Sequence, residues 1–137
     1  MEDRYLFKAK HFKKWHIGNI VKEPDGLYIR DIKENVMTYI NDESTICQCT
    51  GLKDKNGNLI WENDIVKDLF SDACAQIKYG SYQSCFDSTK TEHVGFYVDW
   101  SGKCTKRYRK DLGYWINMVN AEVIGNIFDD PELIKEI

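Results

Sequence analysis

Long apolar runs are missing from this chain of 137 residues, and so is any excess of positive charge. No stretch approaches the roughly 18 apolar residues of a membrane-spanning helix. The N-terminal residues, Met1 to Arg4, lack the basic start and the apolar core of a signal peptide. The net charge of −3 provides no global field that would favour a polyanion. These shortages predict a cytoplasmic protein with no membrane partner.

Patterns of catalytic residues are equally scarce. The nine glycines stand singly, so no glycine-rich loop can cradle a phosphate group. The serines of the polar stretch 81–92 lack the strand–turn–helix context of a catalytic nucleophile. The three histidines, His11, His16 and His93, are scattered along the chain. We therefore expect neither an enzyme nor a bound cofactor.

Five cysteines, an odd number, are typical of a protein from a reducing compartment. Cys47 and Cys49 would share one face of a strand, which allows two interpretations. They could be half of a metal site, completed by a histidine or by one of the remaining cysteines, Cys74, Cys85 and Cys104. They could instead be small buried hydrophobic residues. The chain has no second closely spaced ligand pair, so we favour the second interpretation and expect no metal and five free thiols.

Aromatic residues, in contrast, are abundant and make up 13% of the chain. Together with regularly spaced turn residues, these large flat side chains favour a β-rich fold. The turn Pro24-Asp25-Gly26 predicts a hairpin over 15–32. Alternating apolar residues predict strands over 93–100 and 122–128, and the polar stretch 81–92 predicts a long loop. Short strands between turns are typical of a barrel or a sandwich.

The stretch from Thr50 to Val66 is the most informative part of the sequence. It reads Thr-Gly-Leu-Lys-Asp-Lys-Asn-Gly and then, after an apolar segment, Glu-x-Asp-Ile-Val. This pattern resembles the signature of the YopX-like proteins of phages and prophages. Further segments resemble that family in the same order along the chain, namely 5–10, 77–80, 95–97 and 123–133. The family usually has Gly at the position of Asn63, so we expect left-handed backbone there, which Asn tolerates next best after Gly.

The resemblance implies a β-rich protein encoded by a phage, without an established activity. Combined with the strand pattern, it predicts a mainly β fold in three parts. A small N-terminal β-sheet subdomain over 1–53 packs on an SH3-like β-barrel over 54–130. A short C-terminal helical turn follows over 131–137, because Asp130 is a good N-cap and Pro131 suits the first helical position.

The acids of the signature have a catalytic and a structural interpretation. Glu62 and Asp64 could act as an acid–base or metal-binding pair, because alternate residues of a strand share a face. We favour a structural role, in which these carboxylates and that of Asp54 accept hydrogen bonds from backbone N–H groups and fix the turns. The residues that we expect to act structurally are Thr50, Gly51, Asp54, Asn56, Gly57, Glu62, Asn63, Asp64, Gly125 and Asn126.

One basic segment is the best candidate for a binding site. Phosphate groups favour clustered cations, and nucleic-acid bases stack on aromatic rings. Between residues 100 and 115 the chain places such cations beside Trp100, Tyr114 and Trp115. The candidate partner-binding residues are Lys103, Lys106, Arg107, Tyr108, Arg109 and Lys110. A second basic set lies near the N-terminus and consists of Lys8, Lys10, His11, Lys13 and Lys14.

Two functions remain open at this stage. We favour a phage or prophage accessory protein that binds a protein partner or its own copies, because strand edges and aromatic residues are hard to bury fully in so small a chain. A homo-oligomer is therefore expected. The alternative is a nucleic-acid-binding protein that uses segment 100–115. The alternative is less favoured because the net charge of −3 opposes non-specific binding to a polyanion.

Overall fold

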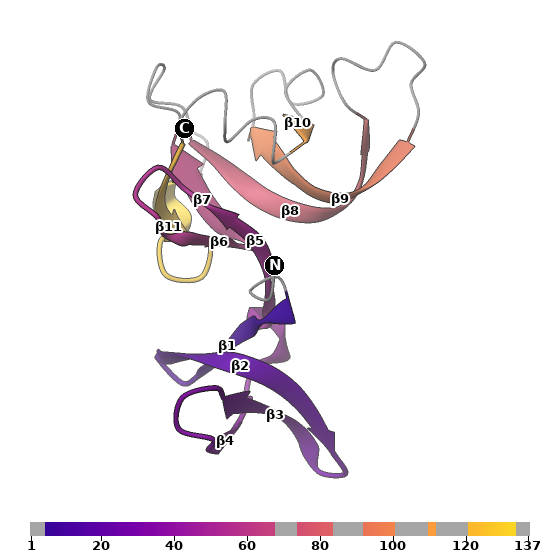
Figure 1. The fold of residues 1–137 in the computed structure, drawn as a ribbon, viewed down its shortest axis with the longest axis vertical. Coiled ribbons are helices and arrows are strands. Elements are labelled where there is room, and N and C mark those ends of the chain that lie inside the picture. The colour runs from indigo at the N-terminus through magenta and orange to yellow at the C-terminus, as the bar shows by residue number, and fades with distance from the viewer. Residues whose placement is uncertain (1–4, 68–73, 84–91, 101–109, 112–120, 134–137) are drawn as a thin grey trace. The chain divides into compact units, whose positions relative to one another are not determined.

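The computed structural model describes residues 5–67, 74–83, 92–100, 110–111 and 121–133, and within these ranges the chain is mainly β (Figure 1). The expected β-rich fold is thus confirmed. Two short 3₁₀ turns, η2 and η4, span Glu43–Thr45 and Pro131–Leu133. The second of them begins at Pro131, where the sequence predicts a helical turn, and the Leu133 N–H donates to the Asp130 carbonyl at 3.1 Å.

The strands fall into two compact units, the N-terminal unit Met1–Gly51 and the C-terminal unit Leu52–Ile137. The boundary between the units lies inside strand β5. The strands of the structure are β1 Phe7–His11, β2 Lys14–Glu23, β3 Gly26–Asp31, β4 Met37–Tyr39, β5 Cys47–Lys53, β6 Leu59–Trp61, β7 Asp64–Lys67, β8 Cys74–Gln83, β9 Glu92–Trp100, β10 Lys110–Asp111 and β11 Glu122–Asn126.

The first sheet is antiparallel over β1 to β4 and has the strand order β4-β3-β2-β1-β5-β6. Strands β2 and β3 form the hairpin predicted over 15–32. Alternate residues on one face of this sheet are apolar, and they form a core of the N-terminal unit. That core consists of Ala9, Ile29 and Ile40, with Ile20, Leu27 and Ile46 packed against it.

Gly18 lies buried in the middle of β2, between β1 and β3. A glycine inside a strand often marks a bend or bulge, but the pairing of β2 with both neighbours runs through Gly18 without a shift of register. The structure gives another reason for glycine. A Cβ atom at this position would collide with the backbone carbonyl of Arg30 on β3.

The second sheet belongs to the C-terminal unit and has the order β10-β9-β8-β7-β11. Its core consists of Ile60, Val66, Ala75, Ile77, Val98 and Ala121, all fully buried. Among the described residues, no pairing joins β10 to β11, so the sheet is open and the SH3-like barrel stays a prediction. Strands β8 and β9 form a long, curved hairpin (Figure 1), and they extend into the stretch that the sequence predicts to be a loop over 81–92.

Candidate functional site

The carboxylate of Asp54 joins its own turn to strand β11 of the C-terminal unit. Its Oδ1 accepts hydrogen bonds from the backbone N–H groups of Asn56 and Asn58, each at 2.9 Å. Its Oδ2 accepts from the backbone N–H of Val123 on β11, also at 2.9 Å. The turn closes further through the Gly57 N–H, which donates to the Asp54 carbonyl at 3.0 Å. The backbone hydrogen bonds expected of the Asp54 carboxylate are present, and the structure adds the partner on β11.

The two residues of the Asn-Gly pair in this turn differ in backbone conformation. Gly57 has a φ of +83°, which glycine adopts freely, but Asn56 does not adopt positive φ. Asn56 instead contributes its side chain, whose amide donates to Glu122 Oε2 at 3.1 Å. The N–H of Lys55 donates to the carbonyl of Ala121 at 3.1 Å. The turn is therefore attached to β11 by side chains and by backbone.

The environment of Asp54 affects its titration. Burial of the side chain, which is 6% exposed, raises the pKa of the carboxyl group. The hydrogen bonds donated by Val123, Asn58 and Asn56 outweigh burial, so the pKa lies below its ordinary value. These bonds lower the pKa because they are made to the charged form of the group.

This shift predicts that Asp54 makes the C-terminal unit sensitive to acid. A carboxyl group whose pKa is lowered by folding stabilises the fold above the unfolded pKa of about 4, and that stabilisation is lost as the pH falls through the folded value. We expect the Asp54→Asn variant to lose less stability than the wild type between pH 7 and acid. Urea unfolding at a series of pH values measures this difference. Parallel pH profiles for the two proteins would contradict the expectation.

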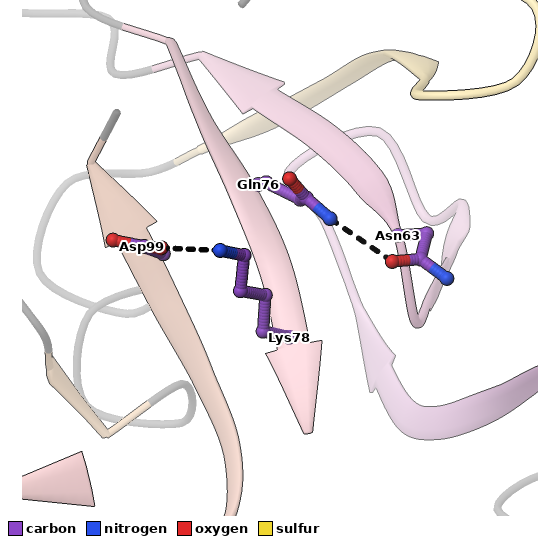
Figure 2. A network of polar contacts seen from close by, with 4 residues as sticks. All are labelled: Asn63, Gln76, Lys78 and Asp99. Atoms are coloured by element: carbon purple, nitrogen blue, oxygen red, sulfur yellow. Dashed lines mark hydrogen bonds and ion pairs between the residues drawn. The ribbon is translucent and has the colours of Figure 1, made fainter. Parts of the chain in front are cut away.

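The turn Trp61-Glu62-Asn63-Asp64 connects β6 to β7, and Asn63 has a φ of +71°. The left-handed backbone expected at Asn63 is therefore confirmed. The Asn63 N–H donates to the Ile77 carbonyl at 2.7 Å, and its carbonyl accepts from the Ile127 N–H at 3.1 Å. Its side-chain oxygen accepts from Gln76 Nε2 at 3.0 Å (Figure 2). The turn thus connects β8 to the segment that follows β11.

Asp64 fixes the same turn from its other end. It is 3% exposed, and its Oδ2 accepts from the backbone N–H of Trp61 at 2.8 Å. Glu62 lies in the turn and Asp64 begins β7, so the two acids are not alternate residues of one strand. The hydrogen bond that we expect the Asp64 carboxylate to accept from the backbone is present.

In the turn that follows β11, side chains again accept hydrogen bonds from nearby backbone N–H groups. Asn126 Oδ1 accepts from the N–H groups of Phe128 and Asp129, at 3.0 and 2.9 Å. Asp130 Oδ2 accepts from the Asn126 N–H at 3.3 Å. A Cβ atom at Gly125 would collide with the Asp130 carboxylate, and a β-bulge between Val123 and Gly125 shifts the register against β7. Gly125 therefore leaves the space that this turn needs.

Strands β8 and β9 carry an ion pair on the face opposite their buried apolar residues, on the same face as the side chain of Gln76, which bonds Asn63. Lys78 Nζ lies 2.7 Å from Asp99 Oδ2, with the two side chains 40% and 10% exposed (Figure 2). The strand alternation places both residues on the face opposite the buried Ile77 and Val98. The ion pair compensates an acid that would otherwise be costly to bury.

Cys47 and Cys49 are both buried on β5, as the favoured interpretation predicts. The Cys47 thiol donates to the Thr45 carbonyl at 3.2 Å, and Cys49 Sγ accepts from the Gly51 N–H at 3.5 Å. Gly51 itself has a φ of +81°. Within the described ranges, no three His, Cys, Asp or Glu side chains meet as a metal site would require. Cys85 and Cys104 lie outside those ranges, so the absence of zinc stays a prediction.

The basic segment falls almost entirely outside the described residues. Lys103, Lys106, Arg107, Tyr108 and Arg109 are not described. The backbone of Lys110 pairs with Val98 as part of β10. Binding through this segment stays a prediction.

The second basic set lies within the described residues, and its side chains do not share one face of the first sheet. The ammonium groups of Lys8 and Lys10 lie 4.6 and 5.3 Å from the centroid of the Trp15 ring. His11 lies on the opposite face, where its Nδ1 is 2.9 Å from the Tyr39 carbonyl and therefore donates to it. Lys13 and Lys14 are exposed at the β1–β2 turn.

The structure brings together a surface that the sequence analysis does not identify. We define the outer face as the side of β1 to β4 opposite the core, and none of its side chains is fully buried. From the strand register, it consists of Lys8, Lys10, Trp15, Ile17, Asn19, Val21, Glu23, Tyr28, Arg30, Ile32, Met37 and Tyr39. Alternation along 15–21 and 28–32 is the sequence signal that could have revealed it.

A second exposed apolar surface lies on the β8–β9 hairpin. Tyr79 pairs with Phe96, and their rings meet edge to face with centroids 5.0 Å apart. Tyr79 is 53% exposed and Val94 is 70% exposed. These residues continue the face that carries the buried Ile77 and Val98. We call Tyr79, Val94 and Phe96 the hairpin patch.

A comparison with protein-family models matches residues 8–135 to the family described as YopX protein. The chain belongs to the YopX family. The match covers both units and includes the signature turns of Asp54, Asn63 and Asn126. Among curated proteins, none is significantly similar to the chain. In the described part of this YopX-family protein, no helix is long and apolar enough to cross a membrane.

Proposed function

We propose that this YopX-family protein is a non-enzymatic accessory protein of a phage or prophage that acts in the host cytoplasm by self-association. The observation that carries the proposal is the hairpin patch, where core-facing positions of β8 and β9 continue into exposed side chains. Exposed apolar groups that extend a core mark an interaction surface, because their burial against a partner is favourable.

A second copy of the chain is the partner that the hairpin patch suits. In an isologous dimer the same surface is used by both copies, so charged residues near the two-fold axis would face like charges. Tyr79, Val94 and Phe96 are uncharged and can therefore meet their own copies without electrostatic repulsion. The patch supplies two aromatic rings, which are the side chains most enriched at interface centres.

The roles of the signature acids support a non-enzymatic function. The carboxylates of Asp54 and Asp64 each accept backbone N–H groups, and both side chains are buried. Asp64, one of the two acids that could have formed a general acid–base pair, therefore has a structural partner.

The proposal predicts a mass that depends on the hairpin patch. The wild-type chain should form a defined oligomer whose mass is a multiple of 16.1 kDa. The Val94→Ser variant should shift this equilibrium toward the monomer by about tenfold or more, because it removes exposed apolar area at the interface. Light scattering after gel filtration, on nuclease-treated protein over a range of concentrations, measures the mass.

Val36→Ser is the matched control, since Val36 is also exposed but lies in the N-terminal unit. It should leave the mass unchanged. A wild-type chain that stays monomeric at every concentration, or an equal effect of Val36→Ser and Val94→Ser, would refute self-association through the hairpin patch.

A further inference from the structure

Asn56 and Gly57 form a chemically reactive pair in the Asp54 turn. In this sequence, Gly57 is the only glycine that directly follows an asparagine. A backbone nitrogen can attack the side-chain amide carbon of the preceding asparagine, and glycine permits this best because it has no side chain to block the approach. Both residues are exposed, so water reaches them. The pair therefore has the chemistry for spontaneous deamidation, in which asparagine loses its side-chain amide as ammonia.

The folded turn restrains both reacting groups. The Gly57 N–H, whose nitrogen is the nucleophile, donates to the Asp54 carbonyl at 3.0 Å. The Asn56 amide, which is the leaving group, donates to Glu122 Oε2 on β11 at 3.1 Å. Loss of the Gly57 proton breaks the first hydrogen bond, and rotation of the Asn56 side chain away from Glu122 breaks the second. The folded turn therefore opposes the reaction until it opens.

We propose that Asn56 is a deamidation site that the attachment of the Asp54 turn to β11 keeps unreactive, and that deamidation there weakens this attachment irreversibly. Local opening of the turn exposes the reactive pair. The product then cannot make the contact that protected it. Deamidation at Asn56 does not depend on self-association through the hairpin patch.

The reaction is a cyclisation followed by hydrolysis. Hydroxide removes the Gly57 N–H proton, and the nitrogen forms a bond to Asn56 Cγ while the bond from Cγ to the amide nitrogen breaks. The amide takes up a proton from solvent and leaves as ammonia. Water then opens the cyclic imide, giving aspartate if the new Cγ–nitrogen bond breaks, or isoaspartate if the original backbone bond breaks. One water is consumed and one ammonia is released, and no group is oxidised or reduced.

The product changes the contact between the turn and β11. A carboxylate at position 56 has no N–H to donate, so two negative groups meet where the Asn56 amide now bonds Glu122. Lys67 lies opposite Glu122 in the pairing of β7 with β11, and Lys55 is exposed in the turn. These cations reduce the repulsion, but they do not restore the lost bond. The remaining attachments are the Val123 N–H to Asp54 Oδ2 and the Lys55 N–H to the Ala121 carbonyl, and both should open more often.

The first test measures the rate of deamidation in the full chain, folded in buffer and unfolded in urea. Mass spectrometry of proteolytic peptides detects the replacement of NH₂ by OH and assigns it to a residue. The folded chain should react at Asn56 at least about tenfold more slowly than the unfolded chain, because two hydrogen bonds must break first. Asn58 lies in the same turn but precedes a leucine, so it should react more slowly than Asn56 in the unfolded chain.

Glu122→Val tests the attachment itself. The variant removes the acceptor of the Asn56 amide and places a residue that suits a strand. Deamidation in the folded chain should become about threefold faster or more. In urea the rate should equal that of the wild type, because position 122 is far from Asn56 in sequence. Glu23→Val is the control, since it makes the same change at an exposed position of β2 and should leave both rates unchanged.

Asn56→Asp supplies the modified side chain directly, and hydrogen exchange reports on the attachment. The Val123 and Lys55 N–H groups should exchange about fivefold faster or more than in the wild type. The Asp31 N–H, which donates to the Val36 carbonyl in the N-terminal unit, should keep its rate. Adding Glu122→Gln to Asn56→Asp restores a donor opposite the new carboxylate, so most of the lost protection should return. Circular dichroism of each variant confirms that the fold is retained.

Three results would overturn the proposal. One is an equal rate of deamidation at Asn56 in the folded and unfolded chains. Another is a folded Glu122→Val variant that reacts no faster than Glu23→Val. The third is exchange at Val123 that is unchanged in Asn56→Asp, or that is as fast in the double variant as in Asn56→Asp alone.

Discussion

Replacing Asp54 with asparagine is expected to lower the free energy of unfolding by about 3 kcal/mol. The amide retains one acceptor oxygen but presents its NH₂ group to a backbone N–H that the carboxylate now binds. In the wild type, the two carboxylate oxygens accept from Asn56, Asn58 and Val123. A buried N–H without an acceptor costs about 1–3 kcal/mol, and the loss of charge weakens the bonds that remain. Because Asp54 is 6% exposed, water cannot readily replace the lost contact.

Urea unfolding at pH 7, followed by tryptophan fluorescence and circular dichroism, measures this effect. Asp25→Asn is a matched control, because Asp25 is exposed and accepts one hydrogen bond from the Tyr28 hydroxyl. Its loss should be less than about 1 kcal/mol. Equal losses in the two variants would mean that the Asp54 contacts do not stabilise the C-terminal unit in the way the geometry indicates.

Asn63→Val is also expected to destabilise the C-terminal unit. A side chain branched at Cβ is disfavoured at a φ of +71°, and left-handed backbone costs non-glycine residues roughly 1–2 kcal/mol. The substitution also removes the acceptor of the Gln76 amide, which is worth about 1 kcal/mol. The total expected loss is about 2–3 kcal/mol. Asn63→Gly relieves the backbone but removes the same acceptor, so it should change stability by less than about 1 kcal/mol.

Asn19→Val provides the control for this prediction. It is the same chemical change at an exposed position of β2, where a β-branched residue suits the strand. Thermal midpoints of the three variants, measured by circular dichroism, decide the comparison. If Asn63→Val is no less stable than Asn19→Val, the strain assigned to the turn is absent.

The signature turns could be predicted from sequence because their chemistry is local. Gly57 and Asn63 stand where the chain needs positive φ, and few residue types adopt it. Asp54 and Asp64 accept N–H groups only two to four residues away, as short acidic side chains in turns do. The bond from Val123 to Asp54 spans 69 residues, so no local pattern could indicate it.

The arrangement of strands was harder to predict than their existence. The hairpin over 15–32 and the strand over 93–100 have clear turn residues or strict alternation. The continuation of β8 and β9 into 81–92 was not predicted, because polar residues there resemble a loop until a partner strand is known. Phe12 is a further example. Its φ of +56° depends on its N–H donating to Asn41 Oδ1, at 3.1 Å, from a distant part of the sequence.

For the candidate surfaces too, the strands that carry the residues are predictable from sequence, but the grouping of these residues on one surface is not. Tyr79, Phe96 and Val94 are recognisable as strand residues, but their exposure depends on how far the core reaches along the hairpin. The outer face combines residues of four strands, and each strand contributes only two to five of them. The basic sets visible in the sequence are clusters of residues close together along the chain. Arg30 belongs to neither cluster, and only strand pairing places it beside Asn19 and Met37.

The most direct test of self-association through the hairpin patch is the oxidation of individual aromatic side chains by hydroxyl radicals, at dilute and concentrated protein. Tyr79 is 53% exposed in one chain, and Phe12 in the N-terminal unit is 71% exposed. If copies associate through the patch, oxidation of Tyr79 and Phe96 should fall several-fold at high concentration while that of Phe12 stays constant. Oxidation of Tyr79 that stays unchanged while the mass increases, or protection of Phe12 instead, would contradict the proposed function.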